Sequence, residues 1–153
     1  MYSEMLGNKY FLARNYESAA KNFQHTLISD PINKSARKKL IICYTQIGHI
    51  QKAFENFYIL CKEDIDFIID TDVIADDCPC AELTTKYGNR LPYENESYDV
   101  KLMLGMLWLY CDAGKSLEFF KRILVESTGD SRVKEITAIL EDKLKSTNKL
   151  SNN

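Results

Sequence analysis

The chain has 153 residues, of which 45% are hydrophobic, 27% charged and 11% aromatic. This length and composition are sufficient for one domain with an apolar core and argue against disorder of the whole chain. Only six Gly and three Pro are present, which favours helices over a turn-rich β fold. The net charge of −2 argues against nucleic-acid binding, and the longest nearly apolar run, residues 102–111, is too short to cross a bilayer.

The first 62 residues contain two similar segments. Residues 6–31 read LGNKYFLARNYESAAKNFQHTLISDP, which follows the spacing L-G-x₂-Y, A-x₃-F and P through Leu6, Gly7, Tyr10, Tyr16, Ala19, Phe23 and Pro31. The same phase recurs about 34 residues later at Leu40, Tyr44, Ala53 and Phe57. Small residues in this pattern let two antiparallel helices approach, and the aromatic residues fill the space around them. The chain therefore resembles the tetratricopeptide repeat (TPR) family.

This resemblance implies an all-α fold: a right-handed solenoid of TPR-like antiparallel helix pairs in a single domain over residues 1–147. We expect repeats over residues 1–31, 32–64 and 100–127. The third can be aligned through Leu104 and Gly105, which leaves no Ala at the packing position, or through Tyr110 and Gly114. The apolar stripe in DSRVKEITAILEDKLKS predicts a capping helix over 130–146, with Asp130 or Ser131 as its N-cap, followed by a flexible tail over 148–153.

Residues 63–98 match no repeat and are predicted to be an acidic insertion. Residues 63–85 contain eight Asp or Glu and no Lys or Arg, whereas residues 1–62 are basic, most densely in KSARKK at 34–39. The apolar residues of DFIIDTDVIA indicate that most of the insertion is packed, and NRLPYENESYD is predicted to be a loop. One hypothesis is that the insertion docks on the basic first half, either as part of the architecture or by occupying a binding groove. The alternative is that both are solvated surfaces.

The stretch DDCPC, residues 76–80, is the main candidate for chemistry. Cys78 and Cys80 are weak candidates for a metal or thiol site, because one intervening residue is shorter than the usual zinc or thioredoxin-like spacing. In the structural interpretation, Pro79 occupies the first position of a helix, Cys78 is its N-cap and Gly88 ends it. The five cysteines are odd in number and scattered, which favours a reducing cytoplasm over a disulfide scaffold. We therefore expect a soluble, cytoplasmic protein, not exported by a cleaved signal, with no cofactor and no bound metal.

No arrangement of residues indicates an enzyme. The family resemblance implies a non-catalytic adapter or scaffold that binds a peptide or partner helix in a concave groove. The groove positions carried over are Glu4, Met5, Asn8, Phe11, Leu12, Ser35, Lys38, Lys39, Ile42 and Gln46. Asn8 matches an asparagine that binds a terminal carboxylate in some members, whereas Glu4 replaces a lysine and Lys39 an asparagine of that group.

The lysines of this groove favour an acidic or amphipathic protein partner. We expect no nucleic-acid or membrane partner, and a monomer or homodimer. Two other functions are considered: a TPR-type secretion chaperone, and a thiol or metal site at Cys78 and Cys80.

Overall fold

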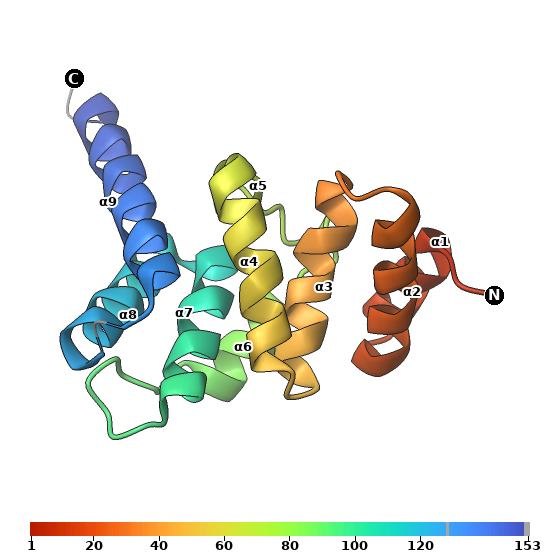
Figure 1. The fold of residues 1–153 in the computed structure, drawn as a ribbon, viewed down its shortest axis with the longest axis horizontal. Helices are drawn as coiled ribbons and strands as arrows, with labels where there is room; N and C mark the ends of the chain where they lie inside the picture. The colour runs from red at the N-terminus through yellow and green to blue at the C-terminus, as the bar shows by residue number, and fades with distance from the viewer. Residues whose placement is uncertain (128, 152–153) are drawn as a thin grey trace.

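The computed structural model describes residues 1–127 and 129–151, with side chains described up to residue 147 (Figure 1). Within these residues the chain forms nine helices and no strand, which confirms the all-α prediction. The helices are α1 (Glu4–Leu12), α2 (Tyr16–Ser29), α3 (Lys34–Gln46), α4 (Ile50–Asp64), α5 (Asp66–Ile69), α6 (Cys80–Tyr87), α7 (Tyr98–Cys111), α8 (Ala113–Glu126) and α9 (Ser131–Ser151).

Short polar side chains begin five of these helices. An N-cap oxygen accepts a hydrogen bond from the backbone N–H three residues later, which satisfies a donor that the helix itself leaves unpaired. The five N-caps are Ser3, Asn15, Asn33, Ser97 and Asp112. Asp112 is also the C-cap of α7. The turn between α7 and α8 is therefore centred on Asp112, two residues before the predicted position near Gly114.

Consecutive helices pack against each other in the series α1 to α4 and again from α7 to α9 (Figure 1). A Cβ atom added to Gly7 of α1 would lie 2.7 Å from the ring of Phe23 in α2. One added to Gly105 of α7 would lie 3.1 Å from the ring of Phe120 in α8. Each glycine thus allows a phenylalanine of the next helix to approach the backbone closely.

The small residue that the sequence pattern lacked in the third unit is Ser116. Its side chain is fully buried, and its Oγ donates a hydrogen bond of 2.6 Å to the carbonyl of Gly105. Gly105 and Phe120 are 15 positions apart, whereas Gly7 and Phe23 are 16 apart. The spacing from Gly105 to Phe120 is one residue shorter than that from Gly7 to Phe23, and for that reason a fixed-spacing comparison missed Ser116.

Helix α7 is the most deeply buried helix of the described chain. Every residue from Lys101 to Tyr110 is buried, because α4, α5, α6 and α8 all pack on α7. A helix that is apolar on all sides requires cover on all sides. The insertion supplies part of that cover through α5 and α6, and the rings of Phe57 in α4 and Phe120 in α8 stack at 5.8 Å nearby.

The last helix is longer than predicted. It extends from Ser131 to Ser151, past the expected end at residue 146. Asp130 caps it, accepting a hydrogen bond of 2.9 Å from the N–H of Arg132. Val133, Ile136 and Leu140 of the predicted stripe are buried, and α9 packs on α8 and α4. Of the predicted tail, residues 152 and 153 lie outside the described residues.

Candidate functional site

Four of the predicted groove residues lie together where one face of α1 adjoins α3: Glu4, Asn8, Phe11 and Lys39. Lys39 Nζ donates a hydrogen bond of 2.9 Å to Asn8 Oδ1, and Asn33 donates one of 3.0 Å to Glu4 Oε2. Lys39 Nζ also lies 5.8 Å from the ring centre of Phe11. Among the described side chains, no ion pair involves Lys39. Its charge is therefore not neutralised by a directly bonded carboxylate.

Apolar side chains on α1 are exposed on either side of Asn8 along the sequence. Met5 is 81% exposed and Leu12 is 59% exposed, seven positions apart and therefore on a similar face of the helix. Ser35 is also exposed, whereas Gln46 is half-buried and donates to Thr45 Oγ1 at 3.3 Å. We refer to Met5, Asn8, Leu12 and Lys39 as the α1 face.

Three predicted groove residues are not at the surface. Phe11 is 1% exposed, because its ring packs edge-on against Tyr16 and Phe23 between α1 and α2. Ile42 is 1% exposed and Lys38 is 6% exposed. In this conformation, none of the three side chains is accessible to a partner in solution.

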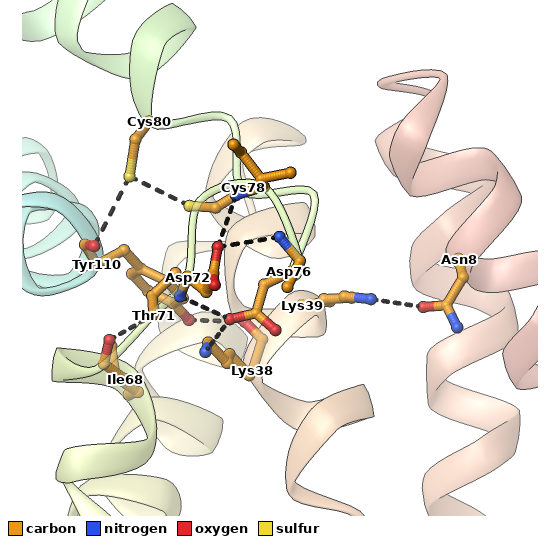
Figure 2. A network of polar contacts seen from close by, with 12 residues as sticks. Asn8, Lys38, Lys39, Ile68, Thr71, Asp72, Asp76, Cys78, Cys80 and Tyr110 are labelled. Atoms are coloured by element: carbon orange, nitrogen blue, oxygen red, sulfur yellow. Dashed lines mark hydrogen bonds and ion pairs between the residues drawn. The ribbon is translucent and has the colours of Figure 1, made fainter.

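Lys38 is buried because the insertion docks on it (Figure 2). Its Nζ forms an ion pair of 2.9 Å with Asp76 and lies 4.9 Å from the ring centre of Phe67. Its backbone carbonyl accepts a hydrogen bond of 2.6 Å from the Tyr110 hydroxyl of α7. Burial would raise the pKa of Asp76, but the hydrogen bonds from Lys38 and from the N–H of Asp72 outweigh burial and hold it below its usual value. Lys38 thus joins α3, α7 and the insertion.

A second contact fixes the insertion to the end of α1. Arg14 donates a hydrogen bond of 2.6 Å to the carbonyl of Asp77 and pairs with Glu82 at 3.4 Å. Arg14 and Asp77 both have positive φ, 61° and 52° respectively, a backbone conformation that is uncommon outside glycine. The acidic insertion is therefore anchored on basic side chains from the first half of the chain, as the docking hypothesis expected.

The cysteines of DDCPC have partners that the sequence did not indicate. Cys80 forms a disulfide with Cys111, with a Cα–Cα distance of 5.8 Å. Cys78 Sγ lies 3.2 Å from Cys80 Sγ (Figure 2). The interpretation in which the DDCPC cysteines only pack and cap is wrong for Cys80. Helix α6 begins at Cys80 with Pro79 as its N-cap, so the predicted cap at Cys78 is one residue early, whereas Gly88 does end the helix. No local signal connects cysteines 31 positions apart, since only the docking of α6 on α7 brings them together.

The free cysteines are protonated near neutral pH. Burial raises the pKa of Cys43 to about 12 and that of Cys78 to about 11, and it raises the pKa of Cys61 as well. Cysteine binds a metal ion as the thiolate, the form that these raised pKa values disfavour at neutral pH, and Cys80 is already bonded to Cys111. Among the described residues, no group of three or more His, Cys, Asp or Glu side chains could hold a metal ion.

Comparison with known proteins identified no relative. No protein-family model matches the chain, and neither the curated proteins nor the solved structures gave a match. Within the described part of the chain, none of the helices combines the length and the apolarity needed to span a lipid bilayer.

Proposed function

We propose that this chain is a non-catalytic adapter with a TPR-like solenoid architecture, and that it binds an acidic or amphipathic peptide on the α1 face. The architecture is supported by the repeated contact between a glycine and a phenylalanine of the following helix, at Gly7 with Phe23 and at Gly105 with Phe120. It is also supported by the buried Ala53 and Phe57 in α4, which stand at the positions of Ala19 and Phe23 in α2. The proposed location is the cytoplasm. In that compartment the Cys80–Cys111 disulfide would form only under oxidising conditions.

The observation that carries this proposal is the pairing of Asn8 with Lys39 beside exposed apolar side chains. Lys39 Nζ has further donor positions besides its bond to Asn8, and the Asn8 amide supplies two more donors. A carboxylate of the partner would accept from these groups, and an apolar side chain of the partner would cover Met5 or Leu12. Charge-assisted hydrogen bonds of this kind are about twice as strong as neutral ones.

The docked insertion limits the length of the proposed binding surface. Lys38 and Ile42 would extend the surface along α3, but the burial of both leaves its accessible part on α1 and around Lys39. A short surface of this type fits a peptide of a few residues or one helix of a partner, not a large folded domain. The proposed partner is therefore a linear acidic motif.

Affinity capture with charge-reversed variants tests this function. The wild-type chain would be used to capture partners from its native cell, and each captured protein would be tested as an acidic synthetic peptide by fluorescence anisotropy. We expect Lys39→Glu to abolish peptide binding, because it replaces attraction by repulsion. The control Lys52→Glu makes the same charge change at an exposed position on α4 and should leave binding unchanged. Equal binding by the wild type and Lys39→Glu, with unchanged unfolding, would rule out the α1 face.

A further inference from the structure

Three cysteine sulfurs from three structural segments lie together where the insertion meets α7. Cys78 is in the loop between α5 and α6, Cys80 is the first residue of α6, and Cys111 is the last residue of α7. Cys80 Sγ is bonded to Cys111 and lies 3.2 Å from the free thiol of Cys78. The central sulfur of the cluster is thus in a disulfide on one side and in contact with a potential nucleophile on the other.

The loop holds Cys78 in this position through contacts of its own backbone and of the two residues before it. The N–H of Cys78 donates a hydrogen bond of 3.0 Å to the carbonyl of Val73. Asp76 is paired with Lys38, and the carbonyl of Asp77 accepts from Arg14. Contacts to α3 and to the end of α1 therefore immobilise the residues directly before Cys78 and position its sulfur at the disulfide.

Cys43 and Cys61 lack this arrangement. Both are buried free thiols, on α3 and α4. Among the side chains of residues 1–127 and 129–147, the sulfur atoms within hydrogen-bond range of another group are those of Cys78 and Cys80. Burial alone therefore does not account for the position of Cys78 beside the disulfide.

We propose that Cys78, Cys80 and Cys111 form a thiol–disulfide exchange site. The Cys78 thiolate attacks Cys80 Sγ, the Cys78–Cys80 bond forms, and the Cys80–Cys111 bond breaks. Cys111 leaves with the bonding electron pair as a thiolate and takes up a proton from solvent, which replaces the proton that Cys78 released. One disulfide is present before and after the step, so no oxidant or reductant is consumed.

The two disulfide isomers differ in how the insertion is attached. The Cys80–Cys111 bond ties α6 to α7, whereas a Cys78–Cys80 bond lies entirely within the insertion. Exchange therefore releases the covalent link to α7 while the ion pair of Lys38 with Asp76 remains. The small ring closed by cysteines separated by one residue is constrained, which makes Cys80–Cys111 the resting isomer. This inference does not depend on peptide binding at the α1 face.

Peptide mapping under alkylating conditions distinguishes the two isomers. Trypsin cuts after Lys62 and Lys86 and after Lys101 and Lys115, so Cys78 and Cys80 share the peptide 63–86 while Cys111 is in the peptide 102–115. The oxidised full-length protein would be incubated, folded, with N-ethylmaleimide in mildly alkaline buffer, quenched in acid and analysed by mass spectrometry. The resting isomer gives the two peptides crosslinked. Exchange gives peptide 63–86 with an internal disulfide and peptide 102–115 labelled at Cys111.

We expect the exchange products to accumulate with time in the wild type and to be lost in Cys78→Ser. The control Cys61→Ser, which removes a buried thiol outside the cluster, should behave as the wild type. The proposal is overturned if labelled Cys111 and the internal disulfide do not form in the wild type, or if no crosslink is present at the start. Labelling of Cys111 at the wild-type rate in Cys78→Ser would also overturn it. The internal disulfide in the wild-type chain is decisive even if Cys78→Ser does not fold.

Discussion

Replacing Gly7 by alanine tests whether the close approach of α1 and α2 is required. Alanine is favoured over glycine within a helix by about 1 kcal/mol, so the substitution would stabilise an unobstructed site. The new Cβ atom, however, would lie 2.7, 2.9 and 3.1 Å from three ring atoms of Phe23. Phe23 is fully buried and its ring packs against Phe11, so it has little space to move.

The net effect follows from these two opposing contributions. Overpacking in a dense core costs about 1–3 kcal/mol, from which the helix gain of about 1 kcal/mol is subtracted. We therefore expect Gly7→Ala to lower the free energy of unfolding by roughly 0–2 kcal/mol. At Gly105 the corresponding distances to Phe120 are 3.1, 3.2 and 3.3 Å, so Gly105→Ala should be less destabilising than Gly7→Ala.

Urea denaturation followed by circular dichroism measures both effects, and equal m-values would show that the change is in stability. A double-mutant cycle isolates the clash, because Phe23→Leu removes the ring that the new Cβ atom of Gly7→Ala would contact. In that background we expect Gly7→Ala to become neutral or stabilising. The reasoning is refuted if Gly7→Ala alone stabilises the wild type by the full helix gain, or if its effect is the same in the Phe23→Leu background.

Three further outcomes are expected. Gly48→Ala should lower the free energy of unfolding by about 1 kcal/mol, because Gly48 has a φ of +83°, a conformation that is unfavourable for a residue with a Cβ atom. No atom lies within 4 Å of the new Cβ, so a clash would not explain the effect, and an unchanged urea midpoint would contradict the prediction. The lowered pKa of Asp76 contributes stability that is fully present above the unfolded pKa of Asp, about 3.9, and is lost as the pH falls through the folded value. Lys38→Met should therefore weaken the acid dependence of the free energy of unfolding in that acidic range, and an unaltered pH profile would count against the ion pair. The exchange rate at Cys78 should rise with pH up to about 11, because burial raises the pKa of this thiol to that value; the backbone N–H of Cys80 and the charges of Lys38 and Arg14 lower the pKa, and Asp76 raises it. A flat rate profile would exclude the thiolate as nucleophile.

The local packing of the first unit was predictable from sequence. Gly7, Ala19 and Phe23 stand out because their spacing brings them together across one short turn, and the structure places Phe23 against Gly7. Ser116 was not found, because the spacing between Gly105 and Phe120 is one residue shorter than in the first unit and serine is not the residue that the pattern names. Local periodicity thus predicts contacts within a helix pair as long as the turn length is constant.

Contacts between distant segments were less predictable. The acidic insertion and the basic first half indicated docking, but charge alone does not select Lys38 rather than Lys39 as the residue that becomes buried. The Cys80–Cys111 disulfide depends on how α6 lies against α7, which no short motif encodes. Within the α1 face, the pairing of Asn8 with Lys39 follows from the packing of α1 beside α3, two helices that are not consecutive in the chain.

The docked insertion also bears on how the chain unfolds. In an array where each repeat touches only its neighbours, an end repeat can detach while the others stay folded. Here Arg14, just after α1, contacts Asp77 at a separation of 63 positions, and Tyr110 of α7 bonds to the backbone of Lys38 at a separation of 72. Fraying of the first helix pair would therefore also release contacts of the insertion. We therefore expect the insertion to make the two halves unfold as one cooperative unit, and to slow folding because its contacts close long loops.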